Sequence, residues 1–338
     1  MPQPNKFHPG GRPRRAVLYE RLNAQIAELR EELGGLPSPA RAEQIWRGIW
    51  LEEAHNSTAI EGNTLVLKQV EQLLSEGRAV GNKELSEYLE VHGYGDAANW
   101  VYGQAIEPGD WIDGNLISLA EVRHIHTLAM TPVWDVGPHP QATSRERPGS
   151  FREHDIAPFP EGMTPPSWPE IPAAMRDWIT GAQALRDIDQ ASIVEEIATL
   201  HGRFEQIHPF LDGNGRAGRL LLNLLLVRLG YPPAIFYKAD RPRYLQALRR
   251  CDEGDPSPLG ELLARAVLDN LYRFIVPALA GPDRLVPLQA LATSTLSANA
   301  LRVAATRGRL KATKGDDGAW RSSRAWVDQY IRGRHARS

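Results

Sequence analysis

The chain has 338 residues, of which 42% are hydrophobic, a formal net charge of −2 and one cysteine. This length and apolar content are sufficient for two domains, or for one large domain with an appendage. A single cysteine, Cys251, excludes an internal disulfide and a metal site built from several cysteines. The sequence has neither an apolar run of about eighteen residues nor a charged-then-apolar leader, so we expect a cytoplasmic protein without a membrane partner.

The first part of the chain is predicted to be an arm followed by helices. Residues 1–15 are rich in Pro, Gly and basic side chains and lack an apolar period, which is typical of a disordered basic arm. Residues 16–105 are expected to form N-terminal helices. The stretch "LYERLNAQIAELREEL" has apolar residues three and four apart and ends at Gly34 and Gly35, and a second helix is predicted through "RAEQIWRGIWLEEAHNSTAIEGN".

Residues 106–280 are predicted to form a helical core with a loop-rich insert. Between about Val133 and Ile171, Pro and Gly interrupt the helical period, and "PGSFREHDIAPFP" alternates like a short strand or hairpin. The stretch "ASIVEEIATLHGRFEQIHPF" then has the apolar spacing of a helix with one buried face. The next helix, "GRAGRLLLNLLLVRLG", is apolar nearly all round, which predicts a central helix buried on most sides and ending at Gly230.

The junction between these two helices, "HPFLDGNGRAGR", is suited to binding phosphates. A helix N-terminus carries unsatisfied N–H groups and a partial positive charge, and the glycines in 213–215 let the backbone approach an anion closely. Arg216 and Arg219 are three residues apart, so both guanidinium groups can reach over the same helix end. Asp212 is a ligand suited to Mg²⁺, and His208 can act as a general base. The spacing differs from that of a P-loop or a dinucleotide fingerprint, so we predict a different kind of Mg²⁺-nucleotide site.

This junction resembles the signature of the Fic family, His-x-Phe-x-Asp/Glu-Gly-Asn-Gly-Arg-x-x-Arg, and matches it at every specified position. The resemblance extends over residues 16–263. It implies an all-α fold, a helical bundle around a buried central helix with a small β-hairpin flap. It also implies an enzyme that transfers AMP from ATP to a hydroxyl side chain of a target protein, with Mg²⁺ bound and pyrophosphate released. Residues 106–280 would then be the catalytic core.

The resemblance also assigns roles within the motif. His208 is the implied base, Asp212 the Mg²⁺ ligand and Phe210 a core anchor, while Arg216 would steady the α- and β-phosphates and Arg219 would hold the γ-phosphate. The implied nucleotide-binding residues are Gly213, Asn214, Gly215, Arg216, Ala217, Gly218, Arg219 and Tyr244. Tyr244 resembles a tyrosine near the adenine, but Asp240 stands where the family often has Asn, which leaves the purine pocket undefined.

The segment "NSTAIEGN" resembles the inhibitory motif of the family, Ser/Thr-x-x-x-Glu-Gly/Asn, through Ser57, Glu61 and Gly62. Because it precedes the core, it resembles the class with an N-terminal inhibitory helix. A carboxylate that pairs with Arg219 would remove the group that holds the γ-phosphate, so ATP could bind only with its α-phosphate poorly aligned for in-line attack. The alternative is an ordinary surface glutamate before a glycine helix stop.

The segment "PGSFREHDI", residues 148–156, occupies the place of the family's flap, a hairpin whose edge pairs with an extended segment of the target. Edge pairing uses main-chain hydrogen bonds and makes few demands on the target sequence. The alternative is an ordinary loop beside prolines. The implied target-docking residues are Gly149, Ser150, Phe151 and Arg152.

Residues 281–338 are predicted to be a linker and a basic domain. Residues 301–338 carry ten Lys or Arg against three Asp, a charge of +7, which leaves −9 for the remainder. The pattern is a short helix, a turn, a helix from Ser297 to Gly308, a hairpin and a last helix, and it resembles a winged helix-turn-helix. The alternative is a basic bundle packed on the acidic main domain. The candidate DNA-binding residues are Arg302, Arg307, Arg309, Lys311 and Lys314.

Two functions from different classes follow. The first is a self-restrained protein adenylyltransferase that uses ATP and Mg²⁺ and modifies a Ser, Thr or Tyr hydroxyl. The second is a DNA-binding transcriptional regulator whose Fic domain senses nucleotide. His208 beside an intact anion loop favours the enzyme, since a sensor needs the arginines but not the base. The chain itself is among the candidate targets, and DNA and a second copy of the chain are the other partners to test.

Overall fold

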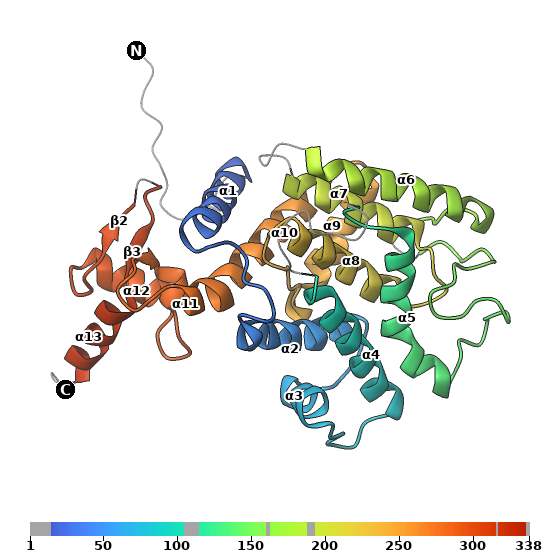
Figure 1. Ribbon diagram of the computed structural model, residues 1–338, viewed down its shortest axis with the longest axis horizontal. Helices are drawn as coiled ribbons and strands as arrows, with labels where there is room; N and C mark the ends of the chain where they lie inside the picture. The colour runs from blue at the N-terminus through green and yellow to red at the C-terminus, as the bar shows by residue number, and fades with distance from the viewer. Residues whose placement is uncertain (1–14, 105–114, 160–162, 188–192, 316, 336–338) are drawn as a thin grey trace, which may run out of the picture.

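The computed structural model describes residues 15–104, 115–159, 163–187, 193–315 and 317–335. These residues are mostly helical, and the strands among them form one small sheet near the C-terminus (Figure 1). The predicted all-α class is therefore confirmed. The predicted arm of residues 1–15 lies outside the described residues apart from Arg15, which is the first residue of a helix.

Four helices make up the N-terminal part of the chain: α1 (Arg15–Glu32), α2 (Glu43–Ile60), α3 (Leu67–Glu76) and α4 (Leu85–Tyr102). α1 ends just before Gly34 and Gly35, whose φ angles of 80° and 81° continue the chain in a left-handed conformation. α2 ends at Ile60, so Glu61 is its C-terminal capping residue, and Gly62, with a φ of 113°, turns the chain away.

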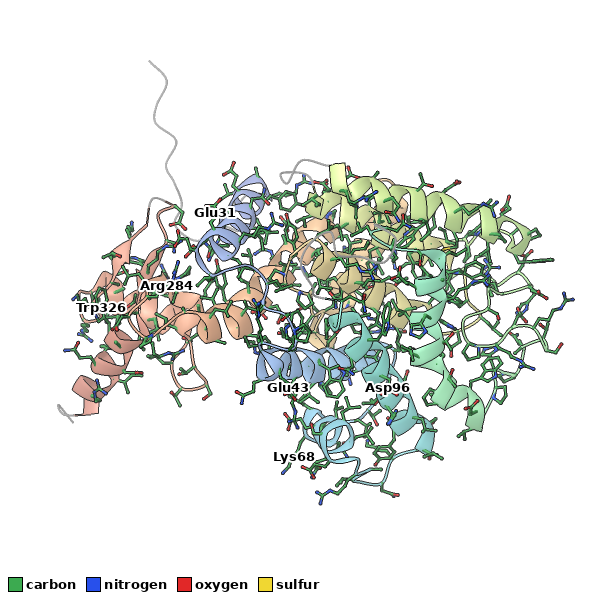
Figure 2. The ribbon with its side chains drawn as sticks, viewed as in Figure 1. Glu31, Glu43, Lys68, Asp96, Arg284 and Trp326 are labelled. Carbon is green, nitrogen blue, oxygen red and sulfur yellow. The ribbon has the colours of Figure 1, made fainter. Side chains whose placement is uncertain are left out.

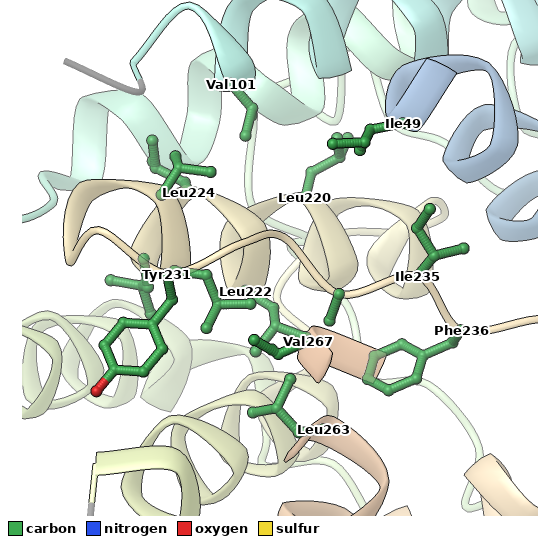
Figure 3. Close-up of a cluster of buried hydrophobic side chains, with 14 of the residues drawn as sticks. Ile49, Val101, Leu220, Leu222, Leu224, Tyr231, Ile235, Phe236, Leu263 and Val267 are labelled. Atoms are coloured by element: carbon green, nitrogen blue, oxygen red, sulfur yellow. The ribbon is translucent and has the colours of Figure 1, made fainter. Parts of the chain in front are cut away.

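The core contains α5 (Leu119–Val136), α6 (Ile171–Ala184), α7 (Ile193–Ile207), α8 (Asn214–Arg228), α9 (Arg241–Asp252) and α10 (Ser257–Asn270). α5 and α7, together with α4, pack on α8, and α6, α9 and α10 pack on α7. α8 is the central helix, because every one of its residues except Gly215 is buried. Figure 3 shows leucines of α8 enclosed by Ile49 of α2, Val101 of α4, and Leu263 and Val267 of α10. Each such buried side chain contributes about 1.5–3 kcal/mol to folding, which anchors the helix.

Short helical turns connect these helices and lead out of the core: η2 (Trp168–Glu170), η3 (Leu185–Asp187), η4 (Lys238–Asp240), a π-helical turn η5 (Leu271–Ile275) and α11 (Val276–Leu279). The π-helical turn continues directly from α10. α11 links the core to the C-terminal part (Figure 1).

The segment expected to be a flap hairpin contains no strand between residues 148 and 156, which corrects that prediction. Phe151 and Arg152 are buried, with 9% and 1% of their surface exposed. The Arg152 guanidinium donates hydrogen bonds to the carbonyls of His208, His154 and Pro166, at 3.0, 2.9 and 2.6 Å. The alternation in the sequence therefore reflects a loop that packs inward, not a free strand edge.

The C-terminal part contains β1 (Val286–Pro287), η6 (Leu288–Leu291), α12 (Ala298–Thr306), β2 (Thr313–Lys314), β3 (Trp320–Ser322) and α13 (Arg324–His335). The sheet is antiparallel in the order β1-β3-β2, so the predicted hairpin forms and β1 adds an edge. Ser297 caps α12, and Gly308, with a φ of 64°, follows its end, both as predicted. The first predicted helix is only the 3-10 turn η6.

Ion pairs attach this C-terminal part to α1. Arg284, labelled in Figure 2, pairs with Glu32 near the end of α1. Arg321 of β3 donates to both carboxylate oxygens of Glu28, at 2.9 and 3.0 Å. Among the described helices, none combines the length and apolarity needed to span a membrane.

Candidate active site

The loop between α7 and α8 has a fixed backbone. His208 has a φ of 49°, a left-handed conformation that is uncommon for a residue with a side chain, and its N–H donates to the Phe204 carbonyl at 3.0 Å. Asn214 accepts from the Phe210 N–H and donates to the Phe210 carbonyl, both at 2.8 Å. Phe210 is fully buried, as expected of a core anchor, and stacks on His126 at 3.7 Å between ring centroids.

His126 is a positioning residue that the sequence did not reveal. Its Nε2 lies 2.8 Å from the Asp212 carbonyl, and its Nδ1 accepts from the Gly149 N–H at 2.8 Å. Nδ1 is therefore the unprotonated nitrogen and Nε2 the donor. Burial lowers the pKa of His126 to about 4, so the ring stays neutral and joins the predicted flap to the catalytic loop.

Glycine is required where the chain enters α8. Gly213 has a φ of 76°, and a Cβ there would lie 2.5 Å from the Met130 sulfur. At Gly215 a Cβ would lie 2.4 Å from Glu61 Oε1 and 3.1 Å from Arg219 Nη1. These glycines allow a close approach to the start of α8, where the N–H groups of residues 214–216 have no carbonyl one turn earlier in the helix to donate to.

Two of the residues predicted to bind the nucleotide, Ala217 and Gly218, are closely packed in the interior. The Ala217 N–H donates to the Gly213 carbonyl at 2.9 Å and its side chain is fully buried. Gly218 is buried against α7, and a Cβ there would lie 2.2 Å from Glu205 Oε1. Both residues are therefore packed in the interior, and their role in phosphate binding stays a prediction.

His208 is suited to accept a proton. Its Nδ1 lies 3.2 Å from the Glu205 carbonyl, which favours the tautomer with the proton on Nδ1 and leaves Nε2 as the base. The ring makes an edge contact with Phe159 at 4.9 Å between centroids. Burial lowers the pKa of His208 to about 4, so the imidazole is neutral at pH 7.

Arg219 is fully engaged by the predicted inhibitory segment. Its Nε donates to Ser57 Oγ at 2.7 Å, and its Nη2 donates to Glu61 Oε1 at 2.7 Å and to the Ser57 carbonyl at 3.0 Å. Burial alone raises the pKa of Glu61, but the adjacent guanidinium outweighs burial and lowers it below its ordinary value. Only 3% of Arg219 is exposed, so a γ-phosphate would have to displace Glu61 to reach it.

Arg216 is held by two carboxylates. Its Nη1 donates to Glu90 Oε1 of α4 at 2.5 Å, and its Nη2 donates to Asp212 Oδ1 at 3.2 Å. Glu90 also accepts from the Asn63 side chain at 2.8 Å, which ties it to the segment that follows Glu61. Sequence reasoning missed Glu90, since a glutamate on a helix without a motif has the pattern of an ordinary surface residue.

Asp212 is the predicted Mg²⁺ ligand. Half of its side chain is exposed (51%), and Oδ1 accepts from the Gly213 N–H at 2.6 Å and from Arg216. Within the described ranges no cluster of three or more His, Cys, Asp or Glu side chains is arranged as a metal site. A single exposed carboxylate beside a phosphate-binding turn still fits Mg²⁺, which usually takes one or two carboxylates together with substrate phosphates.

Tyr244 lies beneath Arg219 and not on an open pocket wall. It is 1% exposed, its hydroxyl is 2.7 Å from His201 Nε2, and its ring stacks on Phe236 at 4.8 Å. The Arg219 guanidinium carbon is 6.0 Å from the ring centroid. The ring therefore supports the arginine, and the contact of Tyr244 with adenine stays a prediction.

The five candidate DNA-binding residues are exposed at the C-terminal end of the molecule, far along the chain from the junction: Arg302, Arg307, Arg309, Lys311 and Lys314. The lysines have aromatic partners, because Lys311 Nζ lies 4.0 Å from the Trp326 ring centroid and Lys314 Nζ lies 5.8 Å from that of Trp320.

Comparison with known proteins gives a family and a set of relatives. The Fic/DOC family model matches residues 116–226. The chain is 30% identical over 250 residues to Protein adenylyltransferase Fic of Aedes aegypti, covering 72% of this chain and 45% of that protein. It is 28% identical over 255 residues to the protein of the same name from Nematostella vectensis, and the match covers 75% of this chain and 55% of that protein. The chain thus spans about half the length of the curated relatives it matches.

Solved structures share the fold. A fragment of Fic-1 from C. elegans superimposes with a TM-score of 0.62 at 24% identity, covering 77% of this chain and 72% of that one. A Fic family protein from Desulfovibrio desulfuricans has a TM-score of 0.55 at 19% identity and covers 94% of this chain and 98% of its own. The second likeness extends through the C-terminal part as well as the core.

Proposed function

Because residues 116–226 of this chain are a domain of the Fic/DOC family, we propose that the protein transfers AMP from ATP to a hydroxyl side chain of a target protein. The observation that carries the proposal is the junction of α7 and α8, where a neutral His208 stands beside a glycine turn and two arginines. The relatives named protein adenylyltransferase support the same reaction.

In this reaction the hydroxyl oxygen of the target attacks the α-phosphorus of ATP. The bond from the α-phosphorus to its bridging oxygen breaks, pyrophosphate leaves, and the hydroxyl proton passes to Nε2 of His208. The Glu205 carbonyl accepts from Nδ1 and orients the ring. Asp212 would hold Mg²⁺, which when bound offsets phosphate charge. Arg216 steadies the phosphates, and the N–H groups of the α8 turn bind the developing negative charge.

We also propose that the reaction is restrained by Glu61. The pair between Glu61 and Arg219 occupies the guanidinium that would hold the γ-phosphate. ATP bound without that contact has no fixed orientation of its α-phosphate relative to His208. Transfer should therefore be slow until Glu61 leaves.

The test compares three proteins: wild type, the single variant Glu61→Gly, and the double variant that combines Glu61→Gly with His208→Ala. Each is incubated with Mg²⁺ and either α-labelled or γ-labelled ATP, and label is followed on the protein itself and on the proteins of a lysate. We expect label from the α-position alone, strong in the single variant and absent in the double variant. Label from the γ-position would mean phosphate transfer. Equal labelling of wild type and Glu61→Gly would contradict the proposal that Glu61 restrains the reaction.

We propose DNA as a second partner, through the C-terminal part. The exposed Arg302, Arg307 and Arg309 on and after α12 support this, since arginines contact phosphates and base edges. Replacing all three by Ala should abolish retention on duplex DNA and its salt dependence, while Arg249→Ala, an exposed change on α9, should leave both unchanged. Equal retention of the two variants would contradict the proposal.

A further inference from the structure

A cavity of about 860 Å³ lies apart from the junction of α7 and α8, and none of residues 208–219 lines it. Its walls come from α1, from the segment that leads into α9, from α10 with its π-helical turn, and from the C-terminal segment around η6. The cavity therefore lies between the core and the C-terminal part. Its volume is within the range of small-molecule sites.

The charged residues that line the cavity are predominantly basic: Arg21, Arg243, Arg265 and Arg273, against Asp240 and Asp269. Arg273 donates to the Tyr237 hydroxyl at 2.8 Å, and that hydroxyl donates to Asp269 Oδ2 at 2.8 Å. Arg243 is exposed, and in the part of the chain that the structure describes it makes no hydrogen bond or ion pair. An exposed guanidinium that lines a basic cavity and has no protein partner is suited to an anion, above all to phosphate oxygens.

One lining residue, Arg273, and two residues that are next in sequence to lining residues hold α2 in place. Arg273 Nη2 donates to Glu52 Oε1 at 2.5 Å, the Lys238 N–H donates to Asn56 Oδ1 at 3.1 Å, and Arg241 Nε donates to the Ile60 carbonyl at 2.7 Å. Glu52, Asn56 and Ile60 are spaced four residues apart, so they form one face of α2. A change in the wall is thereby transmitted to the helix whose end carries Glu61.

We propose that this cavity binds a small phosphorylated molecule of up to mononucleotide size, and that its occupation stabilises α2 in its docked position. A phosphate bound by Arg243 and its neighbours would fix the segment of residues 237–243 against α2. Since the cavity is formed while Glu61 is paired with Arg219, its ligand favours the restrained state over the released one. The coupling half of the inference rests on the proposed role of Glu61, whereas the site itself does not.

The first experiment uses calorimetry on the full chain to measure the binding of AMP and of ribose 5-phosphate. Citrate serves as an anion that carries no phosphate. We expect Arg243→Ala to weaken binding of ribose 5-phosphate about tenfold and the matched change Arg249→Ala, on the same helix but outside the cavity, to leave it unchanged. Equal affinities in the two variants, or citrate bound as well as ribose 5-phosphate, would overturn the site.

Hydrogen exchange locates the bound probe. Protection by ribose 5-phosphate should be found in residues 237–243, in residues 265–273 and in α2. Protection confined to residues 208–219 would mean that the probe binds only at the junction, and would overturn the site.

Coupling is tested through binding and not through AMP transfer. If the ligand favours docked α2, Glu61→Gly should weaken binding of ribose 5-phosphate to the cavity about fivefold, because linkage is reciprocal. Equal affinity in wild type and Glu61→Gly would overturn the coupling. A failure of AMP transfer leaves this measurement unaffected, so the two proposals fail separately.

Discussion

His208 is neutral because of where it lies, and this has a consequence for pH dependence. Burial lowers its pKa to about 4 from an ordinary value of 6.5. A base is lost only when pH falls below its pKa, so an unperturbed histidine would lose activity between pH 7 and 5.5, whereas His208 would not. We predict that kcat/KM for AMP transfer by Glu61→Gly stays within about twofold from pH 8 to pH 5.5.

The measurement uses α-labelled ATP at several pH values, with protein stability checked at each. A fall of about tenfold by pH 5.5 in folded protein would show that His208 titrates near its ordinary pKa, and would contradict the burial described above.

Glu90 is predicted to be a stability residue as well as a partner of the phosphate-binding arginine. The side chain of Arg216 is 7% exposed and that of Glu90 16%, so removing Glu90 leaves a buried guanidinium paired only with the half-exposed Asp212 at 3.2 Å. Glu90→Ala should therefore lower the free energy of unfolding by about 3 kcal/mol. Glu71→Ala, at an exposed position on α3, is the control and should change it by less than about 0.5 kcal/mol.

Urea unfolding of the two variants measures the difference. A loss from Glu90→Ala that is no larger than that of the control would mean that Asp212 alone compensates Arg216.

At the scale of elements, α2 and α8 are joined by hydrogen bonds that concentrate on one guanidinium. Ser57 contributes two of the acceptors of Arg219, its hydroxyl and its carbonyl, and only the hydroxyl is lost in Ser57→Ala. A hydrogen bond to a charged group is worth about 1.5–3 kcal/mol. We predict that Ser57→Ala raises AMP transfer about tenfold over wild type, less than Glu61→Gly does.

Thr58→Val is the matched control. The Thr58 hydroxyl donates to the Ala54 carbonyl at 2.7 Å within α2 and does not contact Arg219. Transfer by Thr58→Val should equal that of wild type. Equal rates for Ser57→Ala and wild type would mean that Glu61 restrains Arg219 without help from Ser57.

For the whole molecule, buried ionisable groups set the response of stability to acid. Burial lowers the pKa of His126 and His208 to about 4 and that of His201 to about 3, and it raises the pKa of Glu53 and Glu205 to about 7. Below pH 6.5 the unfolded chain binds protons on three histidines that the folded chain leaves neutral, which destabilises the fold. Above about pH 4.5 the folded chain keeps protons on two carboxyl groups that the unfolded chain loses. These two protons offset the protons on two of the three histidines.

For these five groups the net difference is about one proton, so they make the free energy of unfolding fall from pH 6.5 to pH 5 by up to about 1.4 kcal/mol per pH unit. Glu205→Gln removes one offsetting group and should make the fall steeper. Urea titrations at several pH values measure both slopes, and a wild-type stability that rises on acidification would contradict the balance of histidines over carboxyls.

The helices and the glycine turn at the start of α8 could be predicted from the sequence because their causes are local. The apolar period of α7, the leucines of α8 and the glycines at 213 and 215 act through neighbouring residues, so they specify a buried helix with an open N-terminal end wherever the rest of the chain folds. The pairing of Glu61 with Arg219 was also expected from the motif around Glu61.

Only the tertiary structure decided which side chains meet. Glu90 and His126 lie on helices whose local sequence gives no sign of a site, and they reach the catalytic loop because α4 and α5 pack on α8. The predicted flap faced inward because Arg152 satisfies three backbone carbonyls, which alternation alone cannot reveal. The sequence by itself thus determined which side chains stand at the N-terminal end of α8. Long-range packing determined their partners, because contacts between distant segments depend on how whole helices fit together.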